Sequence, residues 1–203
     1  MANIIEFPSQ KPQSGLKRVE KSTKGVELKR TNQMDLFSQK SPETNIYILP
    51  SSLTPFEEAL MLDEKDDPNA KDAYQKAIDL NDSAADAYCN LGILEYESGN
   101  TVRAIDSFTK SLKSDPRHFE SHYNLANLYS EVGNLPLAKT HYEFAHELRS
   151  DFPDLAFNLG LVYAMTRDFE SALKILSEYK NMVPQEESTN AEKLIETIRK
   201  ITG

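Results

Sequence analysis

Two of the four histidines have a spacing that metal sites use. His118 and His122 are four residues apart, so on a helix they would face the same side, as in a two-histidine zinc pair. No glutamate accompanies them in the metalloprotease spacing, and His122 lies 34 residues after Tyr88, at a packing position of the repeat described below. We therefore interpret His122 as a packing residue, with a metal site as the alternative.

No other group of residues has the pattern of a catalytic centre. The one cysteine, Cys89, has no second thiol for a metal or redox pair, and we expect it as a small, semi-buried side chain. The sequence contains no glycine-rich phosphate loop and no serine in an elbow motif. Its carboxylates fall on solvated helix faces, with no pair marked as acid and base. The sequence thus predicts no enzymatic activity and no cofactor, and an enzyme or metal protein is the second hypothesis.

The chain is acidic, and its charge is unevenly divided. The net charge is −9, although residues 1–50 hold eight Lys or Arg against five Asp or Glu. The acidic remainder would repel nucleic acid and anionic membranes, so we expect neither as its partner. The first residues do not resemble a secretory signal and no stretch is apolar enough to span a membrane, so we expect a cytoplasmic protein.

A period of 34 residues runs through residues 51–186. Small residues recur in one column at this step and large apolar residues recur in two others. The columns are Ala70, Ala104, Ala138 and Ala172; Tyr74, Phe108, Tyr142 and Leu176; and Leu60, Leu94, Leu128 and Val162. Chance does not place several columns in one register, so the sequence predicts four units, which span 51–84, 85–118, 119–152 and 153–186.

Each unit is expected to form a pair of helices. Apolar residues step by three and four along each half, which is the period of an amphipathic helix. Between the halves, Gly99 and Gly133 can take the left-handed conformation that ends a helix, whereas the fourth unit has a weaker turn at Arg167–Asp168. Small residues such as Gly92 are expected where the two helices cross, because a larger side chain would push the backbones apart.

The second unit resembles the tetratricopeptide repeat. The residues that carry this resemblance are Tyr88, Leu91, Gly92, Ala104, Phe108 and Pro116, with Ser111 where alanine is usual. The resemblance covers about two thirds of the chain and implies an all-α fold, a right-handed superhelix of hairpins whose first helices line a concave groove. It also implies a protein interaction scaffold. The first unit lacks the Leu-Gly pair, so we expect a helix there with a less certain start.

Residues 187–203 are expected to form a C-terminal capping helix. Thr189 to Glu192 has the pattern of a capping box. Five apolar residues are spaced to face the last unit, and they are Ala191, Leu194, Ile195, Ile198 and Ile201. An array otherwise exposes an apolar face at its end, so this helix is expected to act as a lid.

The resemblance also implies which residues line the groove. They come from four positions in the first helix of units two to four: Asp86, Glu120 and Asp154; Cys89, Tyr123 and Phe157; Asn90, Asn124 and Asn158; and Ile93, Asn127 and Leu161. An asparagine amide donates and accepts at once, so three of them in successive units could follow an extended peptide backbone without reading its sequence. The alternative is that asparagine merely belongs to the family pattern.

We expect the groove to bind a neutral or basic, partly apolar peptide segment of a protein partner. Tyr123 and Phe157 would supply apolar pockets, and the acidic column would supply a negative rim. Some tetratricopeptide domains hold the C-terminal carboxylates of chaperones with Lys and Arg in these columns. This sequence has neither residue there, so we exclude that ligand class. The partner's identity and the oligomeric state do not follow from the sequence.

Residues 1–50 are expected to form a disordered basic arm, because they are rich in Ser, Gln, Lys and Pro with little periodic apolar content. Asn45–Pro50 is expected as a short extended piece against the first unit. A second island is similar to the peptides by which bacterial proteins dock on the DNA polymerase sliding clamp, and it consists of Gln33, Met34, Asp35, Leu36 and Phe37. Docking of this island on the repeats is the alternative.

The order of these segments is loosely similar to the C-terminal half of bacterial regulators that fuse a MerR-type DNA-binding domain to tetratricopeptide repeats. Together with the clamp-like island, this similarity implies an alternative function. The chain would then be an adaptor, associated with the sliding clamp or with transcription, that acts through its N-terminal arm.

Overall fold

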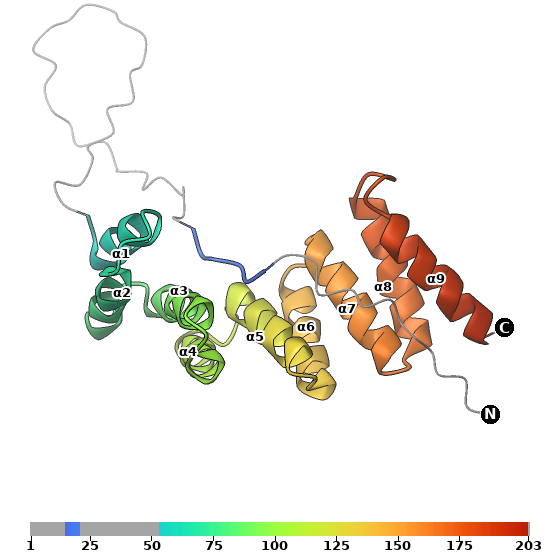
Figure 1. Cartoon of the computed structure of the whole chain (residues 1–203), viewed down its shortest axis with the longest axis horizontal. Coiled ribbons are helices and arrows are strands. Elements are labelled where there is room, and N and C mark those ends of the chain that lie inside the picture. Colours follow the sequence, from blue (N-terminus) through green and yellow to red (C-terminus); the bar gives the residue numbers. More distant parts are fainter. Residues whose placement is uncertain (1–14, 21–52, 203) are drawn as a thin grey trace, which may run out of the picture.

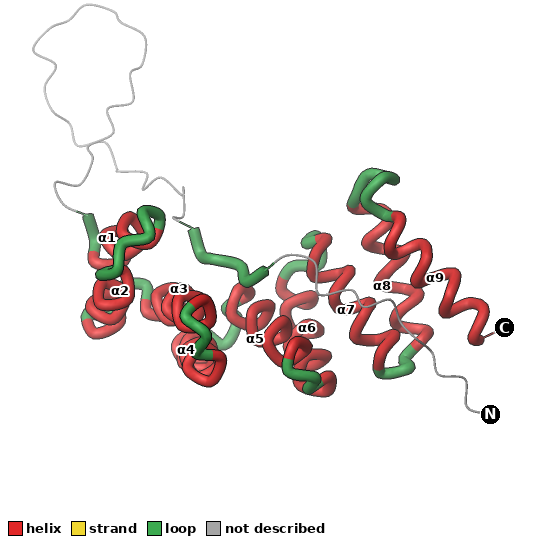
Figure 2. The backbone as a smooth tube through the Cα atoms, in the orientation of Figure 1, coloured by secondary structure: helices red, strands yellow, loops and turns green. Residues whose placement is uncertain are grey.

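The computed structural model describes residues 15–20 and 53–202, and within those ranges it contains nine helices and no strand (Figures 1 and 2). The helices are α1 (Pro55–Asp63), α2 (Ala70–Asp79), α3 (Ala84–Glu97), α4 (Thr101–Ser114), α5 (Phe119–Glu131), α6 (Leu135–Leu148), α7 (Pro153–Met165), α8 (Phe169–Met182) and α9 (Thr189–Thr202). The all-α fold expected from the sequence is therefore confirmed. None of the described helices combines the length and the apolar content needed to cross a lipid bilayer.

The helices stack as four consecutive hairpins followed by α9. The closest helix pairs are the two helices of each hairpin, and the second helix of each hairpin also packs on the first helix of the next unit. Figure 1 shows the hairpins following one another along the molecule, so the apolar core is distributed along the array. Each hairpin buries its apolar face only because a neighbour covers it.

The turns inside the hairpins repeat one left-handed position. The φ angles are 79° at Gly99 and 78° at Gly133, and 63° at Arg167 in the fourth unit. A side chain in this region costs about 1–2 kcal/mol because its Cβ crowds the following carbonyl oxygen. The fourth turn therefore forms despite its sequence, held by the packing of α7 on α8.

Close approach of the paired helices explains the small residues of the repeat. A Cβ atom added at Gly92 would lie 2.8 Å from the Phe108 ring, and one added at Gly160 would lie 2.6 Å from Leu176. Both distances are too short for carbon atoms in contact, so these positions require glycine unless the larger partner moves. The crossing point expected at Gly92 is thus occupied by an aromatic ring.

The first unit forms a helical hairpin although its sequence departs from the repeat pattern. Thr54 caps α1 in a capping box with Glu57, and Pro55 is the first helical residue, where its missing N–H costs nothing. The backbone N–H of Phe56 also donates to the Asp82 carboxylate at 2.8 Å. These local contacts fix the start of α1 where the sequence left it uncertain.

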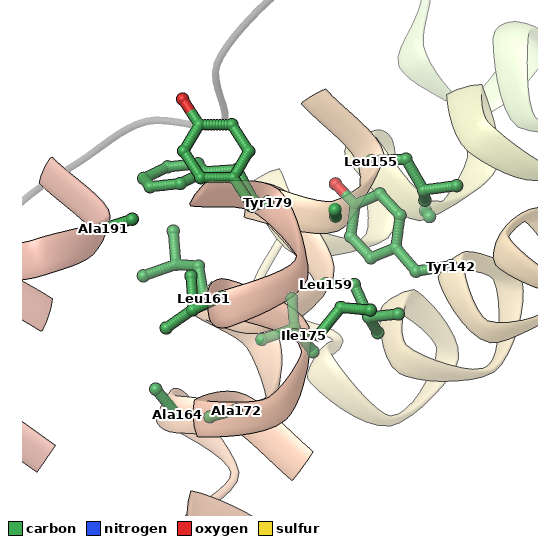
Figure 3. Packing of buried hydrophobic residues seen from close by; sticks show 14 of the residues in the cluster. Tyr142, Leu155, Leu159, Leu161, Ala164, Ala172, Ile175, Tyr179 and Ala191 are labelled. Carbon is green, nitrogen blue, oxygen red and sulfur yellow. The ribbon is translucent and has the colours of Figure 1, made fainter. Parts of the chain in front are cut away.

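The C-terminal helix covers the end of the array, and two details differ from the expectation. Figure 3 shows Ala191 facing the apolar residues of α7 and α8, and Leu194, Ile195 and Ile198 are buried as well. Ile201 was predicted to face inward, but it is 38% exposed, because the last turn of α9 is less completely covered than the turns before it. Thr189 is the first helical residue rather than a capping residue, and its hydroxyl donates to the carbonyl oxygen of Glu186 at 3.1 Å.

Candidate peptide-binding groove

Residues 15–20 lie against the first helices of the second and third units. Figure 1 shows this segment beside α3 and α5, and it has no regular secondary structure. Its four central residues are partly buried. The sequence placed these residues in a disordered arm, and the structure differs because specific contacts hold them on the repeats. The predicted islands Gln33–Phe37 and Asn45–Pro50 lie outside the described residues.

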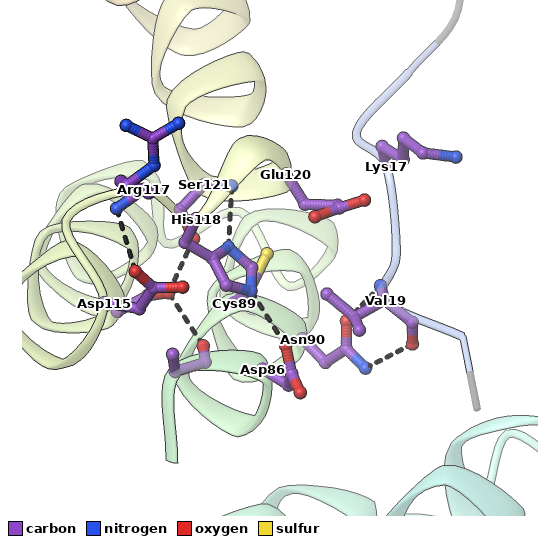
Figure 4. Close-up of polar contacts among 12 residues, drawn as sticks. Lys17, Val19, Asp86, Cys89, Asn90, Asp115, Arg117, His118, Glu120 and Ser121 are labelled. Carbon is purple, nitrogen blue, oxygen red and sulfur yellow. Dashed lines mark hydrogen bonds and ion pairs between the residues drawn. The ribbon is translucent and has the colours of Figure 1, made fainter. Parts of the chain in front are cut away.

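Two asparagine side chains hold the backbone of this segment. The N–H of Val19 donates to Asn90 Oδ1 at 2.8 Å, and Asn90 Nδ2 donates to the Val19 carbonyl oxygen at 3.0 Å (Figure 4). The same pair of bonds joins Lys17 to Asn124, at 2.7 and 3.0 Å. Each amide therefore satisfies both backbone groups of one residue.

The contacts define a direction and a step. Lys17 meets the third unit and Val19 meets the second, so the segment runs opposite to the order of the units. Two residues of the segment correspond to one repeat of the array. The intervening residue, Arg18, directs its side chain to Asp63 and Glu97.

The side chains of the segment make apolar and ionic contacts. Leu16 and Val19 pack on the apolar cluster around Phe108 and Ile93. The Lys17 ammonium lies 5.3 Å from the centre of the Phe152 ring, within the range of a cation–π contact. The groove thus accommodates two apolar residues and two cations of one short segment.

Arg18 bridges two carboxylates. Its Nη1 donates to Asp63 Oδ2, and its Nη2 lies 2.8 Å from each carboxylate oxygen of Glu97. Burial by itself lowers the pKa of Arg18, but attraction to the two negative charges outweighs burial and raises it. The guanidinium is therefore held in its charged form.

The other residues predicted for the groove mostly form the floor of the array. Tyr123, Phe157, Asn158 and Leu161 belong to the third and fourth units and are almost completely buried, with exposed fractions of 0–5%. Ile93 is also buried and packs in the cluster beneath Leu16. The structure brings Asn90, Asn124 and Ile93 together with the segment.

The acidic column has partners within the array. Asp86 Oδ1 lies 2.9 Å from His118 Nε2 (Figure 4), and Glu120 Oε1 lies 3.6 Å from Arg149 Nη1. Asp154, in the fourth unit, is partly buried. At the rim that we predicted to be negative, Glu120 is therefore paired with a cation, and Asp86 is engaged by His118.

Cys89 and Asn127 show how polar groups are treated beneath the groove. Cys89 was expected to be semi-buried, but it is completely buried, and burial raises the pKa of its thiol to about 12. Asn127 Oδ1 accepts from the Tyr142 hydroxyl, while Asn127 Nδ2 has no hydrogen-bond partner in the described part of the chain. The Cys89 thiol is therefore protonated at neutral pH, whereas a cysteine acts as a nucleophile or a metal ligand in its thiolate form.

Two models of the tetratricopeptide repeat match the sequence, over residues 68–119 and 107–140. These matches coincide with the hairpin geometry of α2 to α6. The chain carries tetratricopeptide repeats. Over 79 residues it is also 29% identical to anaphase-promoting complex subunit 3 of Schizosaccharomyces pombe, a stretch that is 39% of this chain and 11% of that protein.

Solved tetratricopeptide structures have the same fold at low sequence identity. A tetratricopeptide repeat protein from Parabacteroides merdae superposes with a TM-score of 0.62 at 20% identity, over 73% of this chain and 59% of that chain. YrrB, described as having an unusual peptide-binding site, gives 0.59 at 21%, over 70% and 82%. The first repeat domain of Spaghetti, bound to the HSP90 peptide SRMEEVD, gives 0.52 at 19%, over 58% and 92%.

The two histidines with metal-like spacing have separate partners in the tetratricopeptide array. His118 Nδ1 accepts from the N–H of Ser121 at 3.2 Å and thereby caps α5. His122 Nε2 lies 3.1 Å from the Pro116 carbonyl oxygen, to which it donates, and its Nδ1 lies 3.0 Å from His141 Nδ1. The described residues contain no cluster of three or more side chains suited to a metal ion.

Sequence reasoning missed the residues that bind Arg18. The two residues are Asp63 and Glu97. They are 34 residues apart, and Glu131 follows them in the same column, so the sequence did contain a signal. The segment itself has apolar residues at Leu16 and Val19 around two cations, a pattern too short to distinguish from a tail. The contact of residues 15–20 with the tetratricopeptide groove could therefore be recognised only in the structure.

Proposed function

We propose that this tetratricopeptide chain is a non-catalytic interaction scaffold. Its groove binds a peptide segment that has no regular secondary structure and is neutral or basic and partly apolar. The observation that carries the proposal is the pair of double hydrogen bonds by which Asn90 and Asn124 hold the backbones of Val19 and Lys17. The ligand is expected to be part of another protein and to take the place of residues 15–20.

Backbone recognition suits a scaffold because it depends little on the ligand's side chains. An amide that satisfies both the N–H and the C=O of one residue offsets the cost of removing those groups from water. Within the array itself, Asn90 Nδ2 donates to the Tyr74 hydroxyl at 3.1 Å and Asn124 Nδ2 lies 3.5 Å from Cys89 Sγ, contacts that position both amides without a ligand. Such preorganisation reduces the entropy lost on binding.

The charges near the groove favour a basic ligand. Asp63 and Glu97 both pair with the segment's Arg18. A peptide with a net negative charge would be repelled by these carboxylates. The sequence SRMEEVD, which occupies the Spaghetti structure, has one arginine before a methionine but three acidic residues, so it is expected to bind more weakly here than a basic peptide.

Binding of a labelled peptide tests this proposal. The probe is residues 12–23 of the chain, and the protein is the full chain with Leu16→Ala, Arg18→Ala and Val19→Ala, called the opened chain because its own segment is weakened. Asn124→Ala in the opened chain removes two hydrogen bonds, each worth about 0.5–1.5 kcal/mol. We therefore expect affinity for the probe, followed by fluorescence anisotropy, to fall roughly 5- to 150-fold.

The matched control is Asn181→Ala, which changes an exposed asparagine on α8 and should leave binding unchanged. Circular dichroism melts establish that each variant is folded. Equal affinity of the parent and Asn124→Ala proteins, or tighter binding of SRMEEVD than of the probe, would contradict the proposed function.

A further inference from the structure

Arg18 enters a site built from the ends of two successive first helices. Asp63 is the last residue of α1 and Glu97 is the last residue of α3, so the two acids occupy the same position of adjacent units. Arg18 Nη1 donates to Asp63, and Arg18 Nη2 lies 2.8 Å from both oxygens of Glu97. One guanidinium therefore joins the first and second units.

The Asp63 side of this site is buried and structurally supported. Asp63 is 8% exposed, and its Oδ2 accepts from the Tyr74 hydroxyl at 2.8 Å. That hydroxyl in turn accepts from Asn90 Nδ2 at 3.1 Å. Asn90 also holds the backbone of Val19, so a continuous hydrogen-bonded chain links the backbone contact to the carboxylate.

A buried carboxylate of this kind requires a cation with suitable geometry. Removing Asp63 from water is costly unless its charge is paired. Arginine presents several N–H groups in a fixed plane and can serve two carboxylates at once, whereas lysine is a single point charge. Arg18 does so from a position between the two backbone contacts.

The next acid of the same column does not repeat the site. Glu131 accepts from the Tyr96 hydroxyl at 2.7 Å, and the fourth unit has Met165 at this position. Within the described repeats, the geometry that receives a guanidinium thus occurs between the first and second units. A single such site can fix the register of a peptide that the asparagines alone would hold in any register.

We propose that Asp63, Tyr74 and Glu97 form an arginine-recognition site that selects the groove's ligands and sets their register. The ligand class is a neutral or basic peptide without regular secondary structure in which an arginine directly precedes an apolar residue. The inference rests on the proposed function, because it specifies the ligand of the same groove. In this structure the occupant is Arg18 of the chain itself, so an external ligand has to displace residues 15–20.

Peptide variants measured on the opened chain test the site directly. The probes are the peptide of residues 12–23 and the same peptide with Arg18→Lys or Arg18→Ala. Loss of a charge-assisted pair is expected to weaken binding by about 10- to 100-fold for Arg18→Ala. Arg18→Lys should fall in between, because lysine cannot serve both carboxylates.

Changes in the protein assign the effect to this site. Glu97 is exposed, so Glu97→Gln in the opened chain should preserve the fold while reducing the preference for the parent peptide over Arg18→Ala. Glu131→Gln changes the same column one unit later and should leave that preference unchanged. Asp63→Asn is expected to reduce the preference for the parent peptide more than Glu97→Gln does. Circular dichroism verifies that this variant folds.

The outcomes separate this inference from the proposed function. Equal affinity for the parent and Arg18→Ala peptides, or an undiminished preference in Glu97→Gln, overturns arginine recognition while the scaffold proposal stands. Failure of the parent peptide to bind the opened chain overturns both proposals. If residues 15–20 of the same chain occupy the groove, the unmodified chain should bind the probe more weakly than the opened chain by the same factor at every protein concentration. A factor that grows with protein concentration would show that the segment comes from a second copy of the chain.

Discussion

Individual polar residues beneath the groove have different roles although they occupy repeated positions. Asn90 and Asn124 each hold a backbone residue of the segment, whereas Asn127 accepts from a buried tyrosine. The resemblance to the tetratricopeptide repeat implied that all of these residues line the groove, because a family pattern identifies the face of a helix but not the partner of a side chain. The same limit applies to the histidines, whose pairing across a hairpin has no signature in their spacing.

Protonation of the His122–His141 pair should destabilise the protein in mild acid. Burial first, and then the neighbouring His122, lower the pKa of His141 to about 4 from an ordinary value of 6.5. Between these pH values the unfolded state binds more protons than the folded state, so stability decreases as pH falls from about 6.5 towards 4. Urea denaturation across this range measures the loss.

Carboxylates also contribute to acid denaturation, so a variant is needed to isolate the histidine effect. His141→Gln lacks the titrating group, and its stability should therefore change less than that of the parent between pH 6.5 and 4. Parallel curves for the two proteins would contradict this assignment of the pH dependence.

At the scale of a helix, α9 shows which features periodicity predicts correctly. Its helical period and its buried residues Ala191, Leu194, Ile195 and Ile198 follow from the sequence. The exposure of Ile201 and the position of Thr189 do not, because they depend on how fully the last turn of α9 is covered and on where the preceding turn closes. Helix ends are decided by local contacts that a periodic pattern does not contain.

Two isoleucines of α9 provide a matched test of its role as a lid. Ile198 is completely buried, so Ile198→Ala should cost about 2–5 kcal/mol through lost contacts and a cavity. Ile201 is 38% exposed, and Ile201→Ala should change the free energy of unfolding by about 0.5 kcal/mol or less. Urea denaturation measures both, and equal costs would show that α9 does not pack as described.

For the molecule as a whole, the array was predictable and its occupant was not. Four hairpins and a C-terminal helix follow from columns such as Ala104 and Phe108, because each unit repeats the same local packing problem. The position of residues 15–20 depends on contacts with residues 71 and 107 positions away. The composition of such a segment predicts a disordered tail, because its few apolar residues cannot form a core alone.

The segment's contacts should stabilise the units that it joins more than the rest of the array. Arg18 contacts α1 and α3, and Lys17 contacts α5, whereas α8 and α9 pack on each other. Repeat arrays gain stability from nearest-neighbour contacts, so loss of a bridge acts locally. Hydrogen exchange followed by mass spectrometry should therefore show faster exchange in α1 and α3 of the opened chain, with α8 and α9 unchanged.

Glu20→Gln, at an exposed position of the same segment, is the control and should leave exchange as in the parent. Unaltered protection of α1 and α3 in the opened chain would show that residues 15–20 rest on the groove without stabilising it, whereas faster exchange throughout would mean that the substitutions affect the whole fold.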